Sequence, residues 1–175
     1  MMQRGRFKRM KKLLIVMDMQ EIAFGQQHAA FFRYDADLLQ KVNAVIDAHA
    51  PDDVIYIRTL MKKGMLSRFA PVQVYDGSPQ AELAAALHKV SDHVFTKYRG
   101  DAFTDQAFAA YVKASGADTA AFAGIDGGGC VALTALTACR NGLHVIIHTG
   151  AVGTMFPAKQ EKHFATLKQL GAEFL

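Results

Sequence analysis

Three residues at the ends of predicted strands could take part in one reaction. Asp18 follows the apolar run LLIVM, Lys97 ends the segment HVFTK, and Cys130 follows an apolar segment and three glycines. The thiolate is the nucleophilic form of cysteine, and a free thiol is mostly protonated near neutral pH. A carboxylate could take the thiol proton, and an ammonium group and a helix N-terminus would both stabilise the resulting anion. The trio therefore predicts nucleophilic catalysis by Cys130.

The stretch IDGGGC gives the glycines before Cys130 a chemical purpose. Glycine lets the backbone turn sharply from a strand into a helix, which leaves unpaired backbone N–H groups around the thiol. Such donors can hold the oxyanion that forms when a thiolate attacks a carbonyl carbon. Considered singly, each feature also has an ordinary explanation: a turn carboxylate, a solvated lysine, a small buried cysteine and a glycine turn. Their occurrence at three exits of one predicted sheet favours the functional interpretation.

Strand-like and helix-like segments alternate along the chain and predict the fold. The expected strands are 13–18, 53–60, 93–97, 119–125 and 144–149, with a short one at 172–175; the expected helices are 35–50, 79–90, 103–115 with Thr104 as N-cap, 130–141 and 157–170. This alternation predicts an α/β fold in three layers, with a mostly parallel sheet of five to six strands between helices. Ligand sites of such sheets lie beyond the carboxyl ends of the strands, where the three candidate residues are placed.

The composition predicts a single domain with a basic N-terminal extension. The chain has 175 residues, of which 51% are hydrophobic and 21% charged, enough for a sizeable core. Residues 1–12 hold six basic side chains and no acid, and the remainder has 14 basic and 16 acidic residues. We expect residues 1–11 to form a solvated extension and residues 12–175 to form one domain. A tail that binds nucleic acid or an anionic surface remains the alternative.

Cysteine usage and apolar runs predict a cytoplasmic protein that binds neither membrane nor nucleic acid. Cys130 and Cys139 lie nine positions apart on one predicted helix, too far along its axis to pair comfortably. A reducing compartment is therefore the default expectation. No apolar run approaches the length that spans a bilayer, and the run near the start is too short for the core of a signal peptide.

Four motifs resemble those of the isochorismatase-like cysteine hydrolase superfamily, which includes nicotinamidases, N-carbamoylsarcosine amidases and ureidoacrylate amidases. They are LLIVMDMQ, KYRGDAF, GIDGGGCV and TALTACRNG, and the resemblance extends from Lys12 to Leu170. It implies a triad in which Asp18 is the general base and Lys97 lowers the pKa of the thiol. Cys130 would attack a carbonyl carbon, and water would hydrolyse the resulting thioester-type intermediate.

The resemblance also implies an oxyanion hole made by the backbone N–H groups of Asp126 and Cys130. A non-proline cis peptide bond would precede the first of them, between Ile125 and Asp126. In the family pattern, Gln20 supports the catalytic carboxylate. The candidates for the substrate pocket are Gln20, Phe24, Phe103 and Asp126.

Departures from the family pattern bear on the substrate. Many relatives have threonine and a polar residue where this chain has Asp126 and three glycines. Asp126 could contact a cationic or amide-bearing substrate, or oppose thiolate formation. Nicotinamidases usually carry a metal site with an Asp-x-His core after the second strand, and the segment RTLMKKGMLSRFAPVQ contains neither that motif nor a histidine. We therefore expect no metal and no cofactor. True isochorismatases lack the cysteine nucleophile, so Cys130 argues against that reaction.

The sequence thus predicts a cofactor-free, homo-oligomeric cysteine hydrolase, a dimer or larger, that cleaves a C–N bond of a small amide, ureide or carbamoyl compound. Two alternatives remain open. One is a family scaffold without turnover that binds a small molecule or a partner. The other is a nucleotide-binding module, because Gly-rich turns also bind phosphates, although neither G-x-G-x-x-G nor G-K-[ST] is present.

Overall fold

The computed structural model describes residues 11–25, 32–64 and 73–175, so nearly all of the basic extension lies outside it. The elements are β1 (Lys12–Met17), α1 (Glu21–Phe24), α2 (Leu38–Asp47), η1 (Pro51–Asp53), β2 (Val54–Thr59), η3 (Pro79–Ala81), β3 (Val94–Lys97), η4 (Ala102–Thr104), α3 (Gln106–Ser115), β4 (Thr119–Ile125), α4 (Cys130–Arg140), β5 (His144–Gly153), α5 (Pro157–Gln169) and β6 (Glu173–Phe174), where η denotes a 3-10 helix. None of the helices in these ranges combines the length and apolar character that a bilayer crossing requires.

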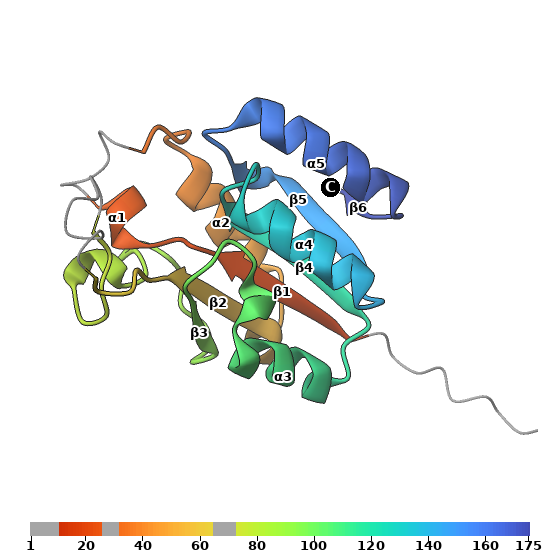
Figure 1. The fold of residues 1–175 in the computed structure, drawn as a ribbon, viewed down its shortest axis with the longest axis horizontal. Coiled ribbons are helices and arrows are strands. Elements are labelled where there is room, and N and C mark those ends of the chain that lie inside the picture. The colour runs from red at the N-terminus through yellow and green to blue at the C-terminus, as the bar shows by residue number, and fades with distance from the viewer. Residues whose placement is uncertain (1–10, 26–31, 65–72) are drawn as a thin grey trace, which may run out of the picture.

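The six strands form one sheet in the order β3-β2-β1-β4-β5-β6, and every neighbouring pair is parallel. Figure 1 shows α2 on one side of this sheet and α3, α4 and α5 on the other. The predicted three-layer α/β fold is therefore confirmed. The described sheet has six strands, the larger of the two numbers expected, and all its neighbouring strands are parallel. Because all strands run the same way, their carboxyl ends meet at one edge.

The central strand β1 separates two apolar cores. Successive side chains of a strand point to opposite faces of its sheet. Leu14 and Val16 belong to the core that includes α2, whereas Leu13, Ile15 and Met17 belong to the core beneath α3, α4 and α5. A slip of one residue would exchange the two sets. Burial on both faces therefore fixes the register of β1, and with it the position of the residue that follows the strand.

The helix predicted over 79–90 is wrong. A 3-10 turn spans Pro79–Ala81, and no α-helix follows it before β3. The backbone instead pairs with the segment that follows β1, since Ala84 N donates to Met19 O at 2.8 Å. This tertiary pairing supplies backbone hydrogen bonds that an α-helix would otherwise have made internally.

The predicted N-cap of the next helix is also wrong by one residue. Thr104 ends η4, and its hydroxyl donates to Asp101 O, whereas Asp105 caps α3 by accepting from Phe108 N at 2.8 Å. Both residue types are good N-caps, so the tertiary position of η4 decides between them. The strand predicted over 144–149 extends to Gly153, past an irregularity in its pairing with β4.

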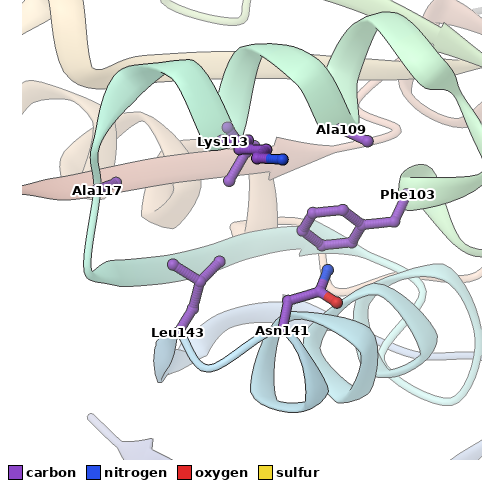
Figure 2. Close-up of a pocket in the computed structure, with 7 residues that line it drawn as sticks. Phe103, Ala109, Lys113, Ala117, Asn141 and Leu143 are labelled. Atoms are coloured by element: carbon purple, nitrogen blue, oxygen red, sulfur yellow. The ribbon is translucent and has the colours of Figure 1, made fainter.

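A cavity of about 500 Å³ lies between α3 and the end of α4 (Figure 2). Its lining residues are Phe103, Ala109, Val112, Lys113, Ala117, Asn141 and Leu143. The ring of Phe103 also packs against Phe108, with 5.0 Å between ring centroids. The structure thus directs Phe103 into this cavity, which none of the three predicted catalytic residues lines, and the expected role of Phe103 in a substrate pocket stays a prediction.

Candidate active site

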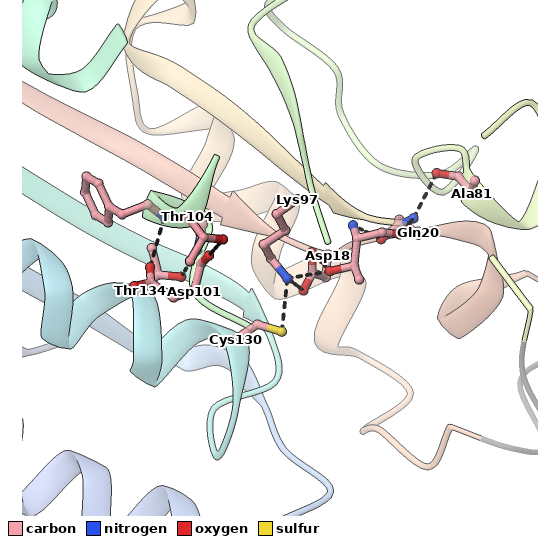
Figure 3. Close-up of polar contacts among 11 residues, drawn as sticks. Asp18, Gln20, Ala81, Lys97, Asp101, Thr104, Cys130 and Thr134 are labelled. Carbon is pink, nitrogen blue, oxygen red and sulfur yellow. Dashed lines mark hydrogen bonds and ion pairs between the residues drawn. The ribbon is translucent and has the colours of Figure 1, made fainter. Parts of the chain in front are cut away.

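The structure brings Asp18, Lys97 and Cys130 into direct contact at the carboxyl edge of the sheet (Figure 3). Lys97 Nζ lies 2.9 Å from Asp18 Oδ2 and 3.1 Å from Cys130 Sγ. The three residues follow or end β1, β3 and β4, and the sheet order places β1 next to β4 and two strands from β3. The ammonium group of Lys97 therefore bridges the carboxylate and the thiol.

The backbone conformation of Asp18 separates β1 from the loop that follows it. Its φ is 53°, in the left-handed region that few residues other than glycine adopt. Its N–H donates to Ile57 O at 2.9 Å, and its carbonyl accepts from Gln20 N at 2.9 Å. These bonds hold the carboxylate next to Lys97, with only 10% of the Asp18 side chain exposed.

Thr59 is a member of the site that the sequence interpretation missed. Its hydroxyl donates to Asp18 Oδ1 at 2.9 Å and also accepts a hydrogen bond from Lys97. Thr59 ends β2, so the reasoning that selected residues at strand exits applies to it as well as to Asp18 and Lys97.

Gln20 is linked to the Asp18 carboxylate indirectly, through Thr59. Its amide NH₂ donates to Thr59 O at 3.0 Å and to Ala81 O at 2.9 Å, and its amide oxygen accepts from Thr59 N at 2.8 Å. Only 2% of Gln20 is exposed. These contacts occupy the amide on the chain itself and fix the position of Thr59, rather than presenting Gln20 to a substrate pocket.

Burial and charge leave both the Lys97 amine and the Cys130 thiol protonated. Burial alone lowers the pKa of Lys97, but the charges of Asp18 and Cys130 outweigh it and raise the pKa above its ordinary value. Lys97 is therefore an ammonium and no base. For Cys130, burial raises the pKa, Asp18 raises it further and Lys97 opposes both, which gives about 12. Lys97 thus acts on the thiol in the expected direction, although the resting thiol keeps its proton.

The backbone before Cys130 offers two unpaired donors. The peptide bond between Ile125 and Asp126 is cis, as expected. Gly127, Gly128, Gly129 and Val131 all donate their backbone N–H groups to acceptors within the chain. Those of Asp126 and Cys130 have no acceptor among residues 11–25, 32–64 and 73–175. These are the two N–H groups that the resemblance assigned to an oxyanion hole.

Close packing explains why Gly128 must be glycine in this turn. None of Gly127, Gly128 and Gly129 has a positive φ. A Cβ atom on Gly128 would lie 2.6 Å from the backbone oxygen of Phe156. The turn therefore lies directly against the segment that follows β5, and a larger residue would force the two apart.

Phe24 and Asp126 are joined by an aromatic side chain that the sequence interpretation did not select. The ring of Phe24 stacks on Tyr34, with 5.9 Å between centroids, and the Tyr34 hydroxyl donates to Asp126 Oδ2 at 3.2 Å. Asp126 forms no ion pair with any cation in the described part of the chain. Its carboxylate therefore interacts with neutral donors.

The loop after Lys97 is tied to the helix that carries Cys130 (Figure 3). Thr137 donates to Asp101 Oδ2 at 2.7 Å, and the hydroxyl of Thr134, which is fully buried, accepts from Ala102 N at 3.0 Å. These bonds connect η4 to α4. They fix the position of the end of β3 relative to the start of α4.

The residues that the structure describes do not fit a metal site. Within the described ranges, no group of three or more His, Cys, Asp and Glu side chains could hold a metal ion. Residues 61–72 contain none of these four residue types, and Lys62 and Lys63 bring positive charge there instead. No step of the chemistry is therefore assigned to a metal.

Comparison with solved structures shows the same fold in several amidases. The chain is similar to PnC1 of L. infantum, solved in complex with nicotinate, with a TM-score of 0.80, 23% identity, and coverage of 94% of this chain and 92% of that chain. It is similar to the pyrazinamidase of Pyrococcus horikoshii in complex with zinc (TM-score 0.79, 22% identity, 94% and 98% coverage). For the N-carbamoylsarcosine amidase of Thermoplasma acidophilum, the TM-score is 0.76 at 20% identity, with 94% and 95% coverage.

A search of curated protein sequences gave no match. The model of the isochorismatase domain matches residues 12–175, which include every residue of the site described above. The chain therefore belongs to the isochorismatase family.

Proposed function

We propose that this chain is a hydrolase that uses Cys130 to cleave a C–N bond of a small amide, ureide or carbamoyl compound. One observation carries the proposal: Lys97 Nζ lies within hydrogen-bond distance of both Asp18 and Cys130. A base, a cation and a nucleophile are thereby in contact at the sheet edge where such folds bind ligands. The pyrazinamidase and the N-carbamoylsarcosine amidase among the similar structures support a C–N bond as the target.

In the first step, the Cys130 proton passes to Asp18 as the sulfur attacks the carbonyl carbon. A pKa of about 12 means that the thiol is protonated until a base removes its proton during the attack. The transfer leaves the summed charge of Asp18, Lys97 and Cys130 unchanged, so the buried site gains no net charge. The Lys97 ammonium remains beside the developing thiolate and stabilises it.

The tetrahedral intermediate places its oxyanion against the free N–H groups of Asp126 and Cys130. Protonated Asp18 then gives its proton to the leaving nitrogen, the C–N bond breaks, and an acyl group remains on sulfur as a thioester. Asp18, again a carboxylate, takes a proton from a water molecule that attacks the thioester. The C–S bond breaks, an acid is released, and the thiol recovers its proton.

The test is a screen of small amides, ureides and carbamoyl compounds for release of ammonia or amine, with matched cysteine variants. Cys130→Ala should lower turnover by about 10³-fold or more, as expected for loss of a nucleophile. Cys139→Ala is the control, because Cys139 lies nine residues along the helix and contacts none of the catalytic atoms named above. Mass spectrometry of the wild type should show an acyl adduct on Cys130.

Undiminished turnover in Cys130→Ala would exclude the proposed nucleophile. If compounds from the screen bind the wild type without any release of ammonia or amine, the chain is instead a family scaffold that binds small molecules without turnover.

A further inference from the structure

The carboxylate of Asp126 collects four hydrogen bonds from three separate parts of the chain. Oδ1 accepts from Gly128 N and from the Thr154 hydroxyl, both at 2.7 Å. Oδ2 accepts from Met155 N at 2.7 Å and from the Tyr34 hydroxyl at 3.2 Å. The bond to Gly128 is a common local turn interaction of Asp. The other three donors are distant in sequence and make the carboxylate a tertiary junction.

The backbone of the same residue holds the turn that leads to Cys130. The carbonyl oxygen of Asp126 accepts from Gly129 N and from Val131 N, both at 3.0 Å. These two N–H groups flank that of Cys130 in the chain. Asp126 therefore orients one free donor as its own N–H and fixes the second through the bonds on either side of it.

We propose that Asp126 is a positioning residue for the oxyanion hole, whose carboxylate clamps the turn 126–129 to the segment after β5 and to Tyr34. This inference rests on the proposed function and adds a role for the Asp126 side chain, which touches no reacting atom. The four donors occupy the carboxylate, so it is not available to bind a cationic substrate. The groups that shift the pKa of Cys130 are Asp18 and Lys97, so Asp126 acts on geometry and not on the thiol.

Tyr34 suits this role because it remains a donor. Burial raises the pKa of its hydroxyl, and the charge of Asp126 raises it further, so Tyr34 keeps its proton at neutral pH and can donate it. Its ring is stacked between those of Phe24 and Phe32, with centroid separations of 5.9 and 6.1 Å. The fourth donor is therefore held by aromatic packing.

The decisive variant is Asp126→Asn, which keeps the shape of the side chain. In either orientation, the amide NH₂ faces a backbone N–H, that of Gly128 or that of Met155. Neither of these groups can act as an acceptor, so the variant replaces at least one hydrogen bond by a contact between two donors. Thr154→Val removes the hydroxyl, which donates to Asp126 and accepts from Gly128 N and Phe156 N. It leaves the other three donors to the carboxylate in place and should have a smaller effect. Thr154→Ser is its matched control because the hydroxyl is kept.

The clamp can be tested without knowledge of the substrate, by comparing two reactions of Cys130. With a small aldehyde such as benzaldehyde labelled with carbon-13 at the carbonyl, the sulfur adds to the carbon, the C=O π bond opens, and the thiol proton passes to oxygen. This adduct places its oxygen in the oxyanion hole. Iodoacetamide instead forms an S–C bond as iodide leaves and the thiol proton passes to solvent, and no negative charge develops on a carbonyl oxygen during this reaction.

We expect Asp126→Asn to weaken aldehyde addition, followed by carbon-13 NMR, on the order of 10²-fold, the effect of losing an oxyanion-hole donor. The rate of alkylation by iodoacetamide should stay within about twofold of the wild type, because the thiol environment is unchanged. Thr154→Val should weaken addition by about tenfold, a fraction of that effect, and Thr154→Ser should restore it. If Asp126→Asn does not fold, the comparison of Thr154→Val with Thr154→Ser tests the clamp instead.

Wild-type aldehyde addition in Asp126→Asn, or in Thr154→Val where Asp126→Asn is unfolded, would overturn the clamp. A parallel fall in aldehyde addition and alkylation would also overturn it, since that is the mark of a general structural defect. Aldehyde addition that persists in Cys130→Ala would overturn the proposed function itself, and the clamp with it. Failure of the clamp alone is distinct, because Cys130→Ala then abolishes addition while Asp126→Asn does not.

Discussion

Replacing Lys97 with Met should destabilise the fold as well as abolish turnover. The side chains of Lys97 and Asp18 are 1% and 10% exposed, and their charged atoms lie 2.9 Å apart. At an effective dielectric constant of about 20, this separation corresponds to about 6 kcal/mol of attraction, which offsets the cost of burying both ions. Met retains the length but leaves a buried carboxylate without its cation. We expect the free energy of unfolding to fall by about 3 to 5 kcal/mol.

A double-mutant cycle measured by urea unfolding near neutral pH tests this reasoning. Asp18→Asn should also be destabilising, because it leaves the ammonium of Lys97 buried without its carboxylate. The double variant, which buries neither charge, should be more stable than the sum of the two single changes predicts, by roughly 2 kcal/mol. All three variants should be inactive. The cycle thus separates the role of the pair in the fold from its role in the reaction.

The matched control is Lys41→Met, since the pair of Lys41 with Asp37 is about half exposed and should contribute less than about 1 kcal/mol. Wild-type stability in Lys97→Met, or additivity within about 0.5 kcal/mol in the cycle, would refute the idea that this buried pair supports the fold.

Three further outcomes are expected. Thr59→Val removes the hydroxyl that contacts the carboxylate and the ammonium, and should lower kcat/KM about 10- to 10²-fold, with Thr59→Ser recovering most of it. Burial lowers the pKa of His148. The stability that neutral His148 contributes is therefore present above the ordinary histidine pKa of about 6.5 and is lost as pH falls below that value. The melting temperature of His148→Leu should vary less with acid pH than that of the wild type. Gly124→Ala should cost more than about 2 kcal/mol in urea unfolding, because φ is +109° and the new Cβ would collide with the backbone oxygen of Met17, whereas Gly150→Ala, with open space around it, should be nearly neutral.

The contact among Asp18, Lys97 and Cys130 could be predicted from the sequence because parallel strands share one carboxyl edge. Asp18, Lys97 and Cys130 each stand where an apolar run ends, and alternation of elements alone places those ends together. Thr59 satisfies the same condition and was overlooked, because a threonine in a strand is usual and draws no attention by its type. Strand ends thus identified the positions of the residues in contact, but the choice of residue types at those ends left out Thr59.

Other features depend on contacts between segments distant in sequence. The spacing of Leu83, Leu87 and Val90 fits a helix, but the backbone there bonds to the segment after β1, which local periodicity does not encode. The contacts of the Asp126 carboxylate could not be predicted from the sequence for the same reason. Of its four donors only Gly128 is a neighbour in the chain, so the sequence interpretation treated the carboxylate as free to meet a substrate or the thiol.

The outermost position of β3 gives the protein a way to lose the contact between Lys97 and Cys130 before it unfolds. β3 has four residues, and within the described sheet its only strand neighbour is β2. Strands at an edge open locally at a lower free energy than the global value. Such fraying would withdraw Lys97 while β1 and β4 stay intact. The ion pair of Lys97 with Asp18 then also holds the edge strand in place, so it sets the lifetime of the assembled site. The backbone amides of β3 should therefore exchange their hydrogens sooner than those of β1.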